Sequence, residues 1–178
     1  VFLIISFILI LLTLLIGTAI GVFQGLLVGK LKLQAFIVTL CGLLSYRGLA
    51  RFSADDTSIN ISDSSQNLEF LRFLGEGSLS DVLSNGNGSG FLHSVPMSFI
   101  YLICFAIFFG VLLHKSVFGR YIFAAGRNEL ATKYSGINTN IVIACAYVIA
   151  GFCTAFAAIP FCIYTGSVQP ATHGAFFE

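Results

Sequence analysis

The run 1–29 carries no charged side chain, and this feature most constrains the fold. A helix rises about 1.5 Å per residue, so this run exceeds the hydrocarbon core of a bilayer, which is about 30 Å thick. Three further stretches with little or no charge, 33–50, 96–113 and 141–164, are also long enough to span. We therefore predict an all-α fold, a polytopic membrane helical bundle with four spans.

The composition agrees with a membrane protein. The chain is 57% hydrophobic and 10% charged, whereas soluble domains are about 45–50% apolar and about 25% charged. Its net charge of +1 indicates no nucleic-acid partner. Its cysteines lie in apolar stretches without C-x-x-C spacing, which predicts buried apolar side chains and neither a disulfide framework nor a metal site. They are Cys41, Cys104, Cys145, Cys153 and Cys162.

The charge distribution predicts how the spans are oriented. The polar insert 51–95 must lie outside the bilayer, because unpaired backbone groups cannot face lipid. This insert is mainly acidic, whereas 30–32 and the loop 114–138 are basic and contain a single acid, Glu129. The positive-inside rule therefore predicts that 51–95 is an external loop and that 114–138 is cytoplasmic.

Small residues recur every fourth position in the first and fourth spans. That spacing places them on one helix face, where another backbone can approach closely. We predict that both stripes pack tightly within one bundle, in preference to a helix pair that slides during transport. The stripes are Gly17, Gly21, Gly25 and Gly29 in the first span, and Ala146, Ala150, Thr154 and Ala158 in the fourth.

Catalytic chemistry is not indicated. Gly25 and Gly29 are separated by three residues where a P-loop needs four, so no nucleotide site is predicted. His93, His114 and His173 lie in different regions without a matched partner. We therefore expect no catalytic residue, no cofactor and no enzyme activity in this chain.

The basic loop 114–138 contains the signals of a short helix. Asn128 is a good N-cap, and Glu129 suits the positive end of a helix. Glu129 and Lys133 stand four residues apart, and Gly136 is a natural stop. These signals predict an isolated, glycine-flanked helix of about two turns, which docks on the ends of the bundle or on a partner protein.

Here the sequence resembles a known family. The run Gly119-Arg120-Tyr121, then Gly126 to Ala131, then Ser135-Gly136-Ile137 is similar to the cytoplasmic loop of bacterial ABC-type permeases for ribose and related monosaccharides. This group belongs to the branched-chain amino acid/ribose permease superfamily. Segments 34–40 and 47–50 fit the same pattern. The resemblance implies these ATPase-coupling residues: Gly119, Arg120, Gly126, Asn128, Glu129, Ala131, Ser135 and Gly136.

The resemblance also implies the partners. A separate ABC ATP-binding subunit would hydrolyse ATP, a second permease subunit would complete a dimer, and a periplasmic substrate-binding protein would deliver the sugar. The location would be the bacterial inner membrane, with several passes through the bilayer. Arg127 and Cys41 stand where this family often has glycine. Because the chain starts at Val1 and lacks the family's later glycine-rich loop, we expect it to be a fragment.

Other functions remain open from the sequence. The cargo of a related permease could instead be a branched-chain amino acid, a nucleoside or a signalling furanose. A secondary transporter would normally carry several ionisable residues within its spans, and only Arg47 is present. A structural membrane protein would not need a capped helix in its cytoplasmic loop.

Overall fold

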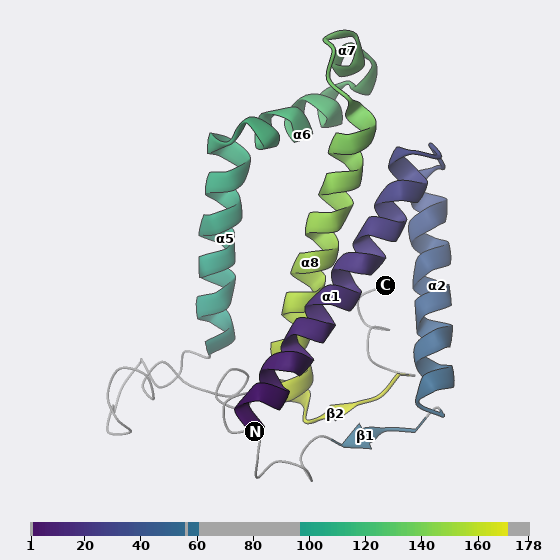
Figure 1. The fold of residues 1–178 in the computed structure, drawn as a ribbon, viewed down its shortest axis with the longest axis vertical. Coiled ribbons are helices and arrows are strands. Elements are labelled where there is room, and N and C mark those ends of the chain that lie inside the picture. The colour runs from purple at the N-terminus through teal and green to yellow at the C-terminus, as the bar shows by residue number, and fades with distance from the viewer. Residues whose placement is uncertain (1, 56, 61–96, 171–178) are drawn as a thin grey trace. The chain divides into compact units, whose positions relative to one another are not determined.

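The computed structural model describes residues 2–55, 57–60 and 97–170, which are almost entirely helical (Figure 1). The elements are α1 (Phe2–Gly29), α2 (Ala35–Ser53), β1 (Ile59–Asn60), α5 (Met97–Lys115), α6 (Val117–Arg127), α7 (Glu129–Tyr134), α8 (Thr139–Thr165) and β2 (Ser167–Val168). Within these residues, four helices are long and apolar enough to cross a membrane: Ser6–Gly29, Ala35–Ser53, Ser98–Lys115 and Thr139–Thr165. The predicted all-α fold with four spans is confirmed for the described residues. Two elements were not predicted, the pair of two-residue strands and the helix α6.

The bounds of the spans differ slightly from the prediction, and local backbone geometry explains one case. α2 begins at Ala35, two residues later than predicted, because Lys32 adopts a φ of 53° in the turn that follows α1. α2 then continues to Ser53, so Arg51 lies in the helix and not in the predicted external loop. Most of that loop lies outside the described residues.

Two threonine hydroxyls within α1 bond to their own helix. The hydroxyls of Thr13 and Thr18 donate to the carbonyls of Leu9 and Leu14, at 2.9 and 2.8 Å. Such i−4 bonds satisfy a hydroxyl inside a membrane without a second helix. These threonines therefore add no polar link between spans.

The chain divides into two compact units. The first contains Val1–Thr13, Leu43–Tyr101 and Phe156–Glu178. In this unit, β1 pairs with β2 in antiparallel fashion, with Ile59 opposite Val168. Because β1 follows α2 and β2 follows α8, the carboxyl ends of α2 and α8 lie on the same side, as four alternating spans require.

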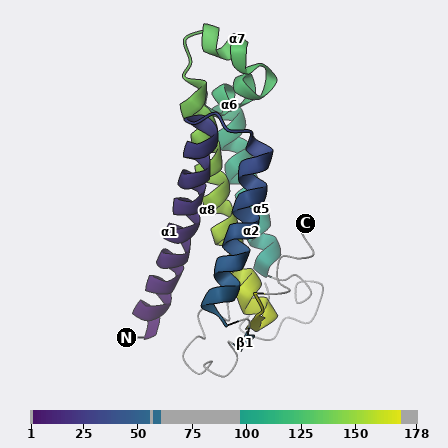
Figure 2. The ribbon, with the colours of Figure 1, turned by 90° about the vertical axis from the view of Figure 1, so that its right-hand side faces the viewer.

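The second unit, Leu14–Gly42 and Leu102–Ala155, contains a close contact between α1 and α8. Gly17 meets Ala155, Gly21 meets Gly151, and Gly29 meets Asn140. Residue numbers therefore increase along α1 while those of the contacting residues in α8 decrease, so the two helices run antiparallel. Figure 2 shows α1 beside α8 over this stretch.

The α1–α8 contact is one of backbone against backbone. A Cβ added at Gly21 would lie 2.6 Å from the carbonyl oxygen of Tyr147, and one at Gly25 would lie 2.7 Å from that of Ala144. A Cβ at Gly151 would likewise lie 2.6 Å from the carbonyl oxygen of Gly17. Real Cβ atoms do not approach this closely. Glycine is thus required here, as in other tightly packed membrane helices.

The face of α8 that meets α1 differs from the stripe that the sequence suggested. The contacting residues include Ala144, Gly151 and Ala155, whereas Ala150 and Thr154 are exposed. The hydroxyl of Thr154 donates to the carbonyl of Ala150, 3.0 Å away within the same helix. A packing role for the stripe formed by Ala146, Ala150, Thr154 and Ala158 stays a prediction.

The α1–α8 contact predicts that adding a single methyl group at one of its glycines strongly lowers stability. In the full-length protein, Gly21→Ala is expected to cost about 1–3 kcal/mol of stability through overpacking, which lowers the thermal midpoint of unfolding in detergent. Gly110→Ala is the matched control, because nothing lies within 4 Å of a Cβ added there. Leu26→Phe, at an exposed position, should also be tolerated. Equal midpoints for Gly21→Ala and Gly110→Ala would contradict the contact.

Candidate functional site

The segment between α5 and α8 holds every residue that the resemblance assigned to coupling, and it begins with a tight corner. Ser116 separates α5 from α6, and its side-chain oxygen accepts from the amide of Gly119 at 3.0 Å. Gly119 is buried, and a Cβ there would collide with the backbone of Leu113. Gly119 therefore allows the first turn of α6 to lie against the last turns of α5.

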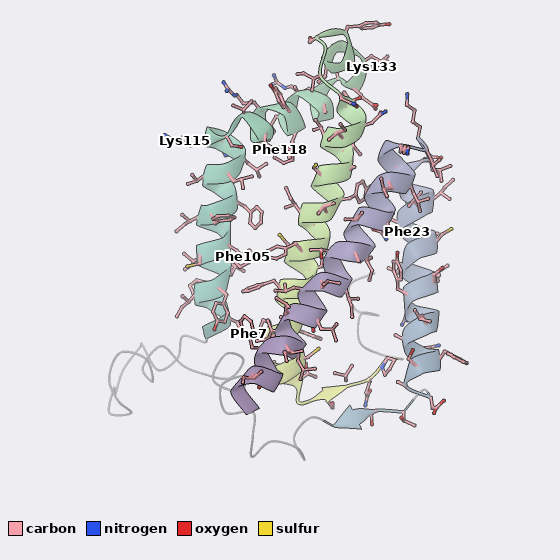
Figure 3. All side chains as sticks on the ribbon, viewed as in Figure 1. Phe7, Phe23, Phe105, Lys115, Phe118 and Lys133 are labelled. Atoms are coloured by element: carbon pink, nitrogen blue, oxygen red, sulfur yellow. The ribbon has the colours of Figure 1, made fainter. Side chains whose placement is uncertain are left out.

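α6 is amphipathic and leads from α5 towards α7 (Figure 1). Phe118 and Ile122 are half-buried and share one face. Arg120 and Arg127, seven residues apart on the opposite face, are exposed. Figure 3 labels Phe118 on α6, between Lys115 at the end of α5 and Lys133 on α7. The segment thus presents basic side chains to its surroundings.

One residue, Asn128, ends α6 and begins α7. Its backbone amide donates to the carbonyl of Ala124 at 3.1 Å, and its side-chain oxygen accepts from the amide of Ala131 at 3.0 Å. Its own backbone is extended, with φ −156° and ψ 103°. This shared cap bends the chain sharply between the two short helices.

The predicted helix of about two turns is found as α7, which has 6 residues. It differs from the prediction in one respect: it is not isolated, because α6 directly precedes it. Gly126 therefore lies inside α6 and does not flank a helix as expected. α6 was not predicted, because its two glycines and its aromatic residues are weak helix formers. The spacing of Phe118 and Ile122 after Ser116 is the signal that indicates it.

The end of α7 has the geometry expected for a glycine stop. The amide of Ser135 donates to the carbonyl of Ala131 at 3.1 Å, and the amide of Gly136 donates to that of Lys133 at 3.1 Å. Gly136 has a φ of +82°, which any other residue would adopt only with strain. This turn returns the chain to the start of α8.

The outward side of α7 is unusually apolar for an exposed surface. Leu130 is 67% exposed and Tyr134 is 89% exposed. They stand four residues apart and therefore share one face. Thr132, on the other side of the helix, is 5% exposed. A small helix that exposes its largest side chains in this way is suited to insertion into a groove of another protein.

Glu129 is directed towards α8. Its Oε1 atom accepts from the hydroxyl of Thr139 at 3.5 Å. Among the described residues no ion pair joins Glu129 to Lys133, despite their helical spacing. An adjoining cleft of about 380 Å³ is lined by residues that include Lys32, Glu129, Asn140 and Tyr147. Within the described part of the chain, no group of His, Cys, Asp or Glu side chains could hold a metal ion.

The chain is similar to import permeases of several bacteria. It is 33% identical over 166 residues to the ribose import permease protein of Haemophilus influenzae, covering 93% of this chain and 46% of the relative. It is 32% identical over 146 residues to the galactofuranose transporter permease protein of Escherichia coli, covering 81% and 38%. It is 30% identical over 152 residues to the fructose import permease protein of Bifidobacterium longum, covering 84% and 38%.

The chain spans less than half the length of these relatives. The comparison with solved structures found no significant match. The model of one family, the permease component of the branched-chain amino acid transport system, matches residues 1–178. With its four apolar helices, the chain belongs to this family of multi-pass membrane permeases.

Proposed function

We propose that this chain forms part of the transmembrane permease subunit of an ATP-driven importer, which moves ribose or a related monosaccharide across a bacterial inner membrane. The observation that carries the proposal is the α6–α7 segment. It lies outside the long helices, is held by specific caps, and exposes Leu130 and Tyr134. The relatives include ribose, galactofuranose and fructose permeases, which supports a monosaccharide as cargo.

The proposed partner of α7 is the ATP-binding subunit of the importer. The chain has no P-loop, so ATP would be hydrolysed on a separate subunit. Leu130 and Tyr134 would enter a groove of that subunit, and the basic side chains of Arg120 and Arg127 would meet its acidic rim. A second permease subunit and a periplasmic substrate-binding protein would complete the assembly.

The proposed mechanism is mechanical. α7 joins α8 through the short turn 135–138, so a displacement of α7 by the ATPase is delivered at the start of a long span. α8 in turn contacts α1 along their glycines. The packed helices would switch between two arrangements as the ATPase closes and opens.

A second cargo class is favoured by one finding. The description of the matched family names branched-chain amino acid transport. Uptake assays with the full-length protein, its ATPase and its binding protein should therefore compare labelled ribose with labelled leucine. Uptake of ribose alone supports the proposal, whereas uptake of leucine alone replaces the cargo class and leaves the architecture unchanged.

The orientation is tested by labelling with a membrane-impermeant thiol reagent. In a cysteine-free, full-length background, Ser58→Cys is expected to react in intact cells, because it would lie in the external loop. Lys133→Cys is expected to react only after the cells are opened. Both positions are exposed, so accessibility does not limit the reaction. Reaction of Lys133→Cys in intact cells would overturn the assignment of α7 to the cytoplasm.

The docking role of α7 is tested by truncating its exposed face. Leu130→Ala and Tyr134→Ala are each expected to reduce co-purification of the ATPase about tenfold, because a buried anchor contributes upwards of about 1.4 kcal/mol. Leu102→Ala is the matched control for Leu130→Ala, since Leu102 is 63% exposed against 67% for Leu130 but lies in the α5 span. Undiminished co-purification of both α7 variants would mean that α7 is only a connector.

A further inference from the structure

The first residue of α7, which is exposed, is bonded to the buried first residue of α8. Glu129 is the first residue of α7 and Thr139 is the first residue of α8. The hydroxyl of Thr139 donates to the Oε1 atom of Glu129 at 3.5 Å, across ten residues of sequence. Thr139 is 2% exposed, so its hydroxyl has little access to water as an alternative partner.

The turn between the two helices strengthens this tie. The amide of Ile137 donates to the carbonyl of Thr132 at 3.4 Å, and Gly136 supplies the left-handed backbone of the turn. Thr132 is itself buried, and its hydroxyl donates to the carbonyl of Asn128 at 2.8 Å. α7 is therefore held against the start of α8 by its inner side, while Leu130 and Tyr134 remain exposed.

Beyond Thr139, α8 enters its contact with α1. Asn140 already lies against Gly29, and the contact continues to Ala155 against Gly17. Because the two backbones touch, α8 cannot shift sideways in this unit unless α1 moves with it. A push delivered at Thr139 would therefore move a pair of helices.

We infer that the Glu129–Thr139 contact transmits movement of α7 to the α1–α8 pair, and that Glu129 is a positioning residue which does not dock on the ATPase. The inference rests on the proposed function. It separates two tasks within α7, since the outer side chains hold the partner and the inner contact passes on its movement.

The competing explanation is that only the charge of Glu129 matters, either at the start of α7 or towards a basic partner. Two pairs of variants separate the explanations. Glu129→Gln removes the charge but keeps a carbonyl acceptor, whereas Glu129→Ala removes both. Thr139→Ser keeps the hydroxyl donor, whereas Thr139→Val removes it and retains the shape of the side chain.

The experiment uses the full-length permease, reconstituted in proteoliposomes with its ATPase and binding protein. Two quantities are measured for each variant: co-purified ATPase, and labelled ribose transported per ATP hydrolysed. Glu129→Ala and Thr139→Val are each expected to lower the transport ratio about fivefold, with co-purification unchanged. Glu129→Gln and Thr139→Ser should stay close to wild type. The double variant Glu129→Ala/Thr139→Val should be no worse than either single variant.

Three results would overturn the inference. Glu129→Gln could be as impaired as Glu129→Ala, which assigns the effect to charge. The losses of Glu129→Ala and Thr139→Val could add in the double variant, which shows that the residues act independently. Full transport by both single variants would show that the contact carries no movement.

The proposed function fails in a distinguishable way. If the wild-type permease retains no ATPase, the importer assignment itself is wrong. If it retains the ATPase and loses it on Leu130→Ala, docking is supported whatever the outcome at Glu129. Measurement of leucine uptake in parallel keeps the inference testable if ribose is not the cargo.

Discussion

The direct contact between the backbones of α1 and α8 is the interaction on which the described structure most depends. In a bilayer, apolar side chains gain little by leaving lipid for another helix, so association relies on close packing. Gly17, Gly21 and Gly25 supply this closeness on α1, and Gly151 supplies it on α8. Thr18 and Thr154 bond to their own helices. Close packing of the two backbones therefore joins this pair in the part of the chain that the structure describes.

The sequence predicts those features that are determined locally or by lipid. Four spans follow from long stretches without charge, because the bilayer accepts few alternatives to a helix. The caps at Asn128 and Gly136 follow from short-range backbone chemistry, and the structure has both. The same reasoning gives the ends of spans only to within a few residues, since single positions such as Lys32 decide where a helix begins.

Features that depend on a partner helix could not be read from one segment. The face of α8 that contacts α1 is set by the register of the pair, and it includes Ala144, Gly151 and Ala155. α6 was missed because its helix is supported by packing of Phe118 and Ile122 more than by intrinsic preference. The contact between Glu129 and Thr139 likewise could not be predicted, because it depends on the path of the chain through the turn at Gly136.

The shared cap at Asn128 makes the length of the segment as important as its composition. Each residue of a helix turns the chain by about 100°. One residue inserted between Asn128 and Leu130 would therefore rotate the face of Leu130 and Tyr134 about a quarter of the way round the helix, even with every side chain retained. Substitutions preserve the direction of this face around the helix axis, whereas insertions change it. The number of residues after Asn128 thus sets the direction in which this face points. Homologous permeases are therefore expected to differ in the side chains of this segment while keeping its length.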